Sequence, residues 1–208
     1  KTITSPTQDQ ETTNKPARPA NNSTNYSDIR WQEDDNKVKA TKKTSARKKI
    51  YRKGPNTMKV ALTFDDGPDA IYTPQVLKVL REKNVKATFF LVGERVKKNP
   101  ALVKQILKDG HTIANHSWSH ADFTKLTEKE LKDEIVNTEK SIEKLIDRKT
   151  ALVRPPYGAV SDKVLNQLQD MNYKVIHWSI DSLDWKAKTK EEVINKTLPK
   201  LHTGAIIL

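Results

Sequence analysis

Short apolar runs alternate with amphipathic helical patterns about six times between Met58 and Leu208. The strand-like runs span residues 58–64, 87–91, 112–114, 151–153, 174–178 and 205–208. The helical patterns between them begin near residues 73, 100, 127, 161 and 189. This alternation predicts an α/β domain of parallel strands joined by crossover helices, either an open doubly wound sheet or a barrel. In both architectures, the residues that follow each strand carry the chemistry.

Capping residues mark where several of these helices begin. Thr127, with Glu130 three positions later, predicts a capping box at the start of the longest helix. Thr189 heads a similar pattern, and Thr73-Pro74 combines a cap with a proline in the first turn.

Residues 1–56 are poor in apolar side chains and rich in Ser, Thr, Asn, Pro and Lys. They are therefore predicted to form a low-complexity, disordered linker, and the folded domain is predicted to span residues 57–208. Nine basic residues occur between Lys37 and Lys53 without one acid, within a net charge of +12. Such a run is typical of a solvated tether that attracts polyanions. We expect anionic wall polymers or a membrane surface as its partner, and no specific nucleic acid.

The chain contains no cysteine, which excludes disulfides and thiolate metal ligands. A metal site would therefore consist of histidine and carboxylate side chains. No stretch reaches the roughly 20 apolar residues that span a bilayer. The chain opens on Lys rather than Met. We therefore expect a mature or fragmentary form whose signal or anchor is not included.

Two adjacent carboxylates follow the first predicted strand, in the segment Thr63-Phe64-Asp65-Asp66-Gly67-Pro68. Neighbouring side chains on extended backbone point to opposite sides, so Asp65 and Asp66 are expected to meet different partners. One of them could bind a metal while the other transfers a proton. The alternative is an acidic turn that caps the following helix.

Two histidines follow the third predicted strand, in His116-Ser117-Trp118-Ser119-His120. With a carboxylate as third ligand, they would leave a tetrahedral ion one open position for water. Surface or core histidines explain such a pair equally well when it is taken alone.

The fourth and fifth predicted strands also lead into polar residues. Arg154 stands before two prolines and could fix a carboxylate by a bidentate contact. Asp184 and Trp185 offer a carboxylate beside a flat apolar wall of the kind that sugar rings prefer. Each segment could instead be a structural ion pair or a buried aromatic.

Taken together and in this order, TFDDGP, HSWSH, RPPYG and the Asp-Trp pair resemble carbohydrate esterase family 4, the polysaccharide deacetylases with a NodB homology domain. The resemblance covers about residues 57–208 and implies a distorted (β/α) barrel. It implies that Asp66, His116 and His120 bind one divalent ion, usually zinc, and that Asp65 is the general base.

The resemblance also implies roles for the remaining residues. Arg154 would orient Asp65, the Tyr157 backbone N–H would stabilise the oxyanion, and Trp185 would line the pocket. The catalytic acid of the family is a histidine two residues beyond the leucine that ends the last strand, with Asp184 as its partner. The chain ends on that leucine, Leu208, so we expect a C-terminally truncated domain with strongly reduced turnover. His202 precedes the strand and is expected at the opposite rim of the barrel.

The predicted activity is removal of N-acetyl groups from the N-acetylglucosamine units of a polysaccharide, with bacterial peptidoglycan favoured by the basic linker. Two alternatives stay open: a chitooligosaccharide deacetylase, and a non-catalytic module that binds glycan. The expected location is extracellular or attached to the cell wall, through secretion or an anchoring segment outside this sequence.

Overall fold

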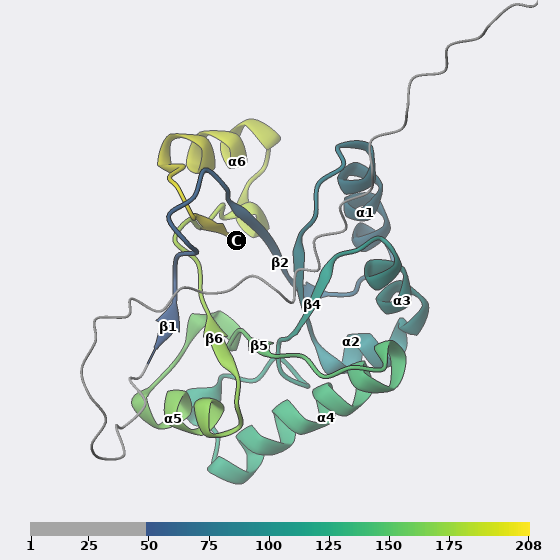
Figure 1. Cartoon of the computed structure of the whole chain (residues 1–208), viewed down its shortest axis with the longest axis vertical. Helices are drawn as coiled ribbons and strands as arrows, with labels where there is room; N and C mark the ends of the chain where they lie inside the picture. Colours follow the sequence, from purple (N-terminus) through teal and green to yellow (C-terminus); the bar gives the residue numbers. More distant parts are fainter. Residues whose placement is uncertain (1–48) are drawn as a thin grey trace, which may run out of the picture. The chain divides into compact units, whose positions relative to one another are not determined.

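The computed structural model describes residues 49–208, which form one parallel sheet with helices around it (Figure 1). The strand order is β1-β6-β5-β4-β3-β2-β7. The strands are β1 (Ile50–Tyr51), β2 (Ala61–Gly67), β3 (Thr88–Leu91), β4 (Thr112–Asn115), β5 (Leu152–Val153), β6 (Lys174–Ile176) and β7 (Ile206–Ile207). The sheet curls, and the prediction of a distorted (β/α) barrel is confirmed.

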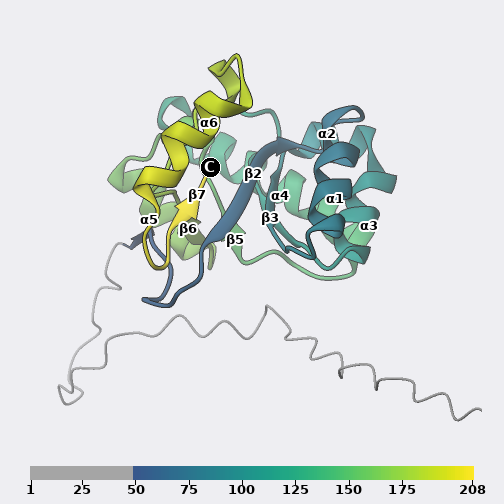
Figure 2. The ribbon, with the colours of Figure 1, turned by 90° about the horizontal axis from the view of Figure 1, so that it is seen from above.

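Helices α1 to α5 lie around the outside of the curled sheet (Figures 1 and 2). The helices are α1 (Tyr72–Glu82), α2 (Gly93–Lys98), α3 (Pro100–Lys108), α4 (Glu128–Ile146), α5 (Asp162–Asp170) and α6 (Lys190–Thr197). In the described part of the chain, four short 3-10 helices occur in the connections: η2 (Phe123–Lys125), η3 (Pro156–Gly158), η4 (Asp184–Lys186) and η5 (Leu198–Lys200). Within residues 49–208, no helix combines the length and the apolar character needed to cross a membrane.

The last strand closes the ring of strands. β7 pairs with β2 on one side, where Ala61 lies opposite Ile206 and Leu62 lies opposite Ile207. On its other side, Ile207 forms a parallel bridge with Ile180, in the segment that continues β6. β1 pairs with the earlier part of β6 and thus lies beside this closure.

Consecutive phenylalanines of β3 fill two different cores, because side chains alternate across a strand. Phe89 packs with Leu77 of α1 and Ile106 of α3, between the sheet and the outer helices. Phe90 packs on the opposite face with residues from three other strands, namely Ala114, Ile176 and Ile206. A third cluster joins α4 and α5 to β5 and β6, through residues that include Leu131, Leu168, Val153 and Val175. The interior of the barrel is therefore packed with side chains.

The sheet begins earlier than the predicted domain boundary at residue 57, and this boundary is corrected. Ile50 and Tyr51 pair with β6, and the Gly54 N–H donates to the Gly204 carbonyl at 2.8 Å. A strand of two residues is too short to show a period, which is why the sequence pattern does not reveal it. The predicted linker before residue 49 lies outside the described residues.

The helix caps agree with the sequence in two places and differ in a third. The capping box of Thr127 and Glu130 is confirmed, and Thr189 caps α6. α1 begins at Tyr72, before the predicted cap at Thr73. The Asp69 carboxylate accepts from the Ile71 and Tyr72 N–H groups at 2.8 Å, while the Thr73 hydroxyl accepts from the Asp69 N–H. The Asp69 side chain therefore replaces Thr73 as the acceptor at this helix start.

Candidate metal and active site

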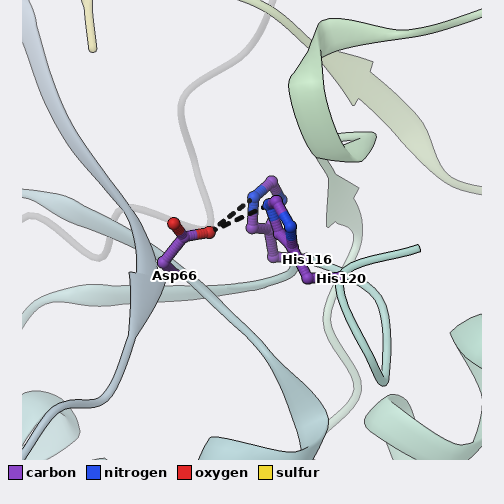
Figure 3. Close-up of side chains that lie close together, drawn as sticks. All are labelled: Asp66, His116 and His120. Atoms are coloured by element: carbon purple, nitrogen blue, oxygen red, sulfur yellow. Dashed lines mark ion pairs between the residues drawn. The ribbon is translucent and has the colours of Figure 1, made fainter. Parts of the chain in front are cut away.

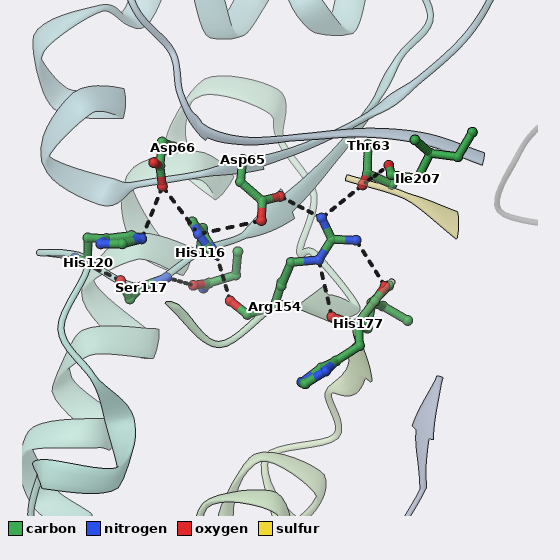
Figure 4. Close-up of polar contacts among 11 residues, drawn as sticks. Thr63, Asp65, Asp66, His116, Ser117, His120, Arg154, His177 and Ile207 are labelled. Carbon is green, nitrogen blue, oxygen red and sulfur yellow. Dashed lines mark hydrogen bonds and ion pairs between the residues drawn. The ribbon is translucent and has the colours of Figure 1, made fainter. Parts of the chain in front are cut away.

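Asp65 and Asp66 face different partners at the end of β2 (Figure 4). The Asp65 carboxylate lies 2.6 Å from the Arg154 guanidinium, and Asp66 faces the two histidines. Asp66 has a positive φ of 65°, and the pairing of β2 with β3 shifts register between Phe64 and Gly67. The expectation that the two carboxylates meet different partners is therefore confirmed.

Asp66, His116 and His120 form the one group of ligating side chains within residues 49–208 that could hold a metal ion (Figure 3). The ligand atoms all lie within 4.8 Å of one another. Asp66 Oδ1 is 3.4 Å from His116 Nε2 and 3.1 Å from His120 Nε2. His116 is buried, whereas the side chains of His120 and Asp66 are 28% and 52% exposed. The cluster is thus anchored in the protein on one side and open to solvent on the other.

The hydrogen bond at His116 Nδ1 shows why this cluster fits a cation. Nδ1 lies 2.7 Å from the Arg154 carbonyl, which can only accept, so Nδ1 carries the proton in the neutral ring. Nε2 then presents a lone pair toward the Asp66 carboxylate, and either a proton or a metal ion must supply a positive charge between the two acceptors. Two imidazoles and one carboxylate are a ligand set of catalytic zinc sites, and a carbonyl acceptor on the other ring nitrogen is the usual second partner.

The charge of Asp66 is consistent with this assignment. When a proton on the imidazoles supplies that positive charge, hydrogen bonds from His116 and, to a smaller extent, from His120 lower the pKa of the Asp66 carboxyl well below its usual range, against the effect of burial. The carboxylate is therefore ionised at neutral pH, as a metal ligand must be.

Arg154 is fully buried inside the barrel and connects several strands. Its guanidinium donates to Asp65, to the Thr63 hydroxyl and to two carbonyls, and it stacks on the Phe90 ring at 4.1 Å. The two carbonyls are those of Ile176 and His177, at 3.3 and 3.1 Å. The contact with Asp65 involves one nitrogen only, so the bidentate contact considered from the sequence is corrected. Burial lowers the pKa of Arg154, and the Asp65 carboxylate opposes this shift.

Tyr157 also lies at the cluster, whereas Asp184 and Trp185 do not contact it. Tyr157 has a positive φ of 61°, and its ring centroid lies 4.7 Å from that of His120. Asp184 and Trp185 belong to η4, and Asp184 Oδ1 accepts from the Trp185 N–H at 2.8 Å. Within the described part of the chain, no hydrogen bond or ring contact joins these two residues to the cluster. His202 is exposed and stands apart from the cluster.

Two residues of the site were not identified from the sequence. The Thr63 hydroxyl accepts from Arg154 at 2.8 Å and donates to the Ile207 carbonyl at 2.7 Å. Thr63 and Asp65 are two positions apart on one strand and therefore share a face, which is a signal that could have found Thr63. The Glu134 carboxylate accepts from the loop between the two histidines, and no local pattern indicates this contact.

Gly93, the first residue of α2, touches this same loop. Its N–H donates to the Ser117 carbonyl at 2.9 Å. A Cβ at this position would lie 2.4 Å from the Trp118 ring and 2.6 Å from the Thr138 hydroxyl. We expect Gly93→Ala to lower the free energy of unfolding by about 1–3 kcal/mol, because overpacking displaces the loop or the helix. Urea unfolding measures this effect, and an unchanged midpoint would contradict it.

Comparison with known proteins agrees with this geometry. Residues 52–176, more than half of the chain, match the polysaccharide deacetylase family. The chain therefore belongs to the polysaccharide deacetylase family. Its structural neighbours include carbohydrate esterases of family 4, so the family predicted from the motifs is confirmed.

Individual relatives support deacetylation of polysaccharides as the activity of the family. A peptidoglycan-N-acetylglucosamine deacetylase of Bacillus cereus is 41% identical over 156 residues, which cover 74% of this chain and 57% of the relative. The crystal structure of a peptidoglycan N-acetylglucosamine deacetylase in complex with 4-naphthalen-1-yl-N-oxidanyl-benzamide has a TM-score of 0.74 at 38% identity, covering 76% of this chain and 74% of the other. A family 4 pseudoenzyme from Bacillus anthracis has the same TM-score at 32% identity, covering 78% and 58%.

Two facts bear on how far these relatives describe the whole protein. The chain spans little more than half the length of the Bacillus cereus relative. The structural neighbours include a pseudoenzyme as well as proteins described as deacetylases. These relatives therefore show the family of the chain, whereas the activity and substrate of the whole protein are proposals.

Proposed function

We propose that this protein hydrolyses N-acetyl groups of N-acetylglucosamine units in a polysaccharide, with a divalent metal ion bound by Asp66, His116 and His120. The observation that carries this proposal is the position of Asp65, which lies next to the cluster but is fixed by Arg154. A bound ion, which we expect to be zinc, would supply Lewis acidity toward the acetamide carbonyl and toward water.

Asp65 has the geometry of a general base. Its Oδ1 accepts from Arg154 at 2.6 Å, whereas its Oδ2 lies 3.8 Å from His116 Nε2. One carboxylate oxygen is thus engaged by the guanidinium, and the other is directed toward the cluster, where it can take a proton from water. Arg154 fixes this division of roles because its planar guanidinium is itself oriented by Thr63 and two carbonyls.

The remaining steps are assigned to the loops beside the cluster. The Tyr157 backbone N–H would stabilise the oxyanion that forms when water attacks the carbonyl. Trp185 is 76% exposed and offers a flat surface for a sugar ring. The Ser182 N–H donates to the Leu208 carbonyl at 2.8 Å, so the end of β7 lies beside the segment that carries Asp184. A histidine that follows Leu208 and protonates the leaving amine would therefore emerge close to Asp184.

Peptidoglycan is the substrate that we propose. The 41% identical relative acts on peptidoglycan N-acetylglucosamine. The basic run between Lys37 and Lys53 would favour an anionic cell wall or membrane surface, which fits an extracellular location. Chitooligosaccharides carry the same N-acetyl group and are the alternative substrate, and a non-catalytic glycan-binding module is the alternative function.

Acetate release by the full-length protein tests this proposal. Purified peptidoglycan and chitin oligomers are compared in the presence of zinc and after chelation. We expect faster release from peptidoglycan, a fall to the background rate on chelation and recovery when zinc is added. Glycan binding without acetate release under every condition would instead identify a non-catalytic module, and faster release from chitin oligomers would identify the alternative substrate.

A further inference from the structure

The loop that carries both histidines has a backbone that needs external support. Ser117 and His120 have positive φ angles of 71° and 64°. Such conformations are unfavourable for residues other than glycine and persist where surrounding contacts determine them. The separation of the two imidazoles, whose ring centroids are 5.1 Å apart, depends on this backbone.

Every backbone N–H from His116 to His120 has an acceptor. Three acceptors come from β3, from the end of β4 and from the loop itself: the Leu91 carbonyl, Asn115 Oδ1 and Ser117 Oγ. The two N–H groups at the centre, those of Trp118 and Ser119, both donate to Glu134 Oε2 at 2.8 Å. The Ser119 hydroxyl donates to the other oxygen, Glu134 Oε1, also at 2.8 Å.

Glu134 is thus the side chain that attaches the centre of the loop to a rigid element. It lies on α4, which has a capping box at its start. Next to Glu134 on this helix, Ile135 accepts with its carbonyl from the buried Asn115 side chain, immediately before the loop. Hydrogen bonds to an ionised acceptor are stronger than neutral ones, and in this contact one carboxylate satisfies three donors.

We propose that Glu134 is a positioning residue for the metal site: through Trp118 and Ser119 it sets the distance between His116 and His120. This inference rests on the proposed function, because it assumes that the two imidazoles bind a metal ion. Glu134 contacts neither histidine, so its effect passes through the backbone of the loop. Outer partners of metal ligands typically change metal affinity by about 10–100-fold.

The same helix provides a matched control. Glu139 also accepts three hydrogen bonds, from the Thr150 N–H, the Thr150 hydroxyl and the Tyr173 hydroxyl, each at 2.6 Å. These partners belong to the segments before β5 and β6, and not to the loop with the histidines. Loss of either glutamate removes three hydrogen bonds from α4. Of the two losses, only that of Glu134 releases the loop that carries His116 and His120.

The experiment measures the zinc dissociation constant of the full-length protein against a competing chelator, for wild type and for Glu134→Ala, Glu134→Gln and Glu139→Ala. We expect Glu134→Ala to weaken zinc binding about 10–100-fold. Glu134→Gln should recover most of the affinity, because its amide oxygen can still accept from both N–H groups. Glu139→Ala should lower the melting temperature of the metal-free protein and leave the zinc affinity unchanged.

Several outcomes would overturn the inference. Equal zinc affinity for Glu134→Ala and wild type would do so, and so would an equal loss in Glu134→Ala and Glu139→Ala, which would reflect general destabilisation. If Glu134→Ala fails to fold, Ser119→Ala takes its place, because it removes only the hydroxyl contact to Glu134. A zinc affinity equal to that of wild type would again overturn the inference. If the wild-type protein binds no zinc, the proposed function fails together with this inference. If wild type binds zinc and Glu134→Ala binds it equally well, only this inference fails.

Discussion

Asp65→Asn is expected to lower the rate of acetate release by about 10²–10⁴-fold, the usual contribution of a general base, while zinc remains bound. The asparagine still offers an oxygen to Arg154, which donates to Asp65 at 2.6 Å in the native protein. It cannot, however, take a proton from water. Rate and zinc affinity are measured on the same full-length preparation, because the prediction requires that the first falls and the second does not.

Asp69→Asn is the matched control for this substitution. Asp69 lies four residues after Asp65, in the connection between β2 and α1, and its carboxylate accepts from the Ile71 and Tyr72 N–H groups. Asparagine can accept the same two hydrogen bonds, so turnover should stay close to that of wild type. Wild-type turnover in Asp65→Asn would show that another group removes the proton.

Arg154→Met has the largest expected effect on stability, a loss of about 3–5 kcal/mol in the free energy of unfolding. The substitution leaves the Asp65 carboxylate, of which only 16% is exposed, without its buried partner. It also leaves the Thr63 hydroxyl and the carbonyls of Ile176 and His177 without a donor. Urea unfolding of the metal-free protein measures the loss apart from any contribution of bound zinc.

A second Arg–Asp pair shows how much of this effect comes from burial. Arg81 and Asp109 lie 2.5 Å apart, but the Arg81 side chain is 49% exposed. Only 8% of the Asp109 side chain is exposed, but Gln105 also donates to its carboxylate, and water can enter the space left by the half-exposed guanidinium. We therefore expect Arg81→Met to cost less than Arg154→Met. Similar losses of stability in Arg81→Met and Arg154→Met would show that burial of the guanidinium does not determine the cost of removing it.

The positions of the candidate residues could be predicted because parallel strands end at a common edge. Asp65, His116 and Arg154 follow different strands, and the structure brings them together. The alternation of side chains along a strand also predicts that Asp65 and Asp66 point in different directions, but the left-handed backbone of Asp66, with a φ of 65°, is not a feature of a regular strand. These features depend on the alternation of strands and helices and on the local order of residues, which the sequence displays directly.

The features that could not be predicted depend on contacts between distant segments or on very short elements. Glu134 borders the apolar face of α4, and its contact with Trp118 spans 16 residues. β1 has two residues, too few for any periodicity. α2 begins at Gly93, two residues after the end of β3, and has no side-chain cap; the acidic Glu94 in its first turn is too weak a start signal to identify it.

The hydrogen bond from Thr63 to the Ile207 carbonyl connects residues that are 144 positions apart. Thr63 is also one of the groups that orient Arg154, so the alignment of Asp65, the proposed general base, depends on a pairing between distant segments. Contacts of such long range are expensive in loop-closure entropy and are expected late in folding. During synthesis on the ribosome, most of the domain would emerge and begin to pack before its catalytic centre could acquire a defined geometry.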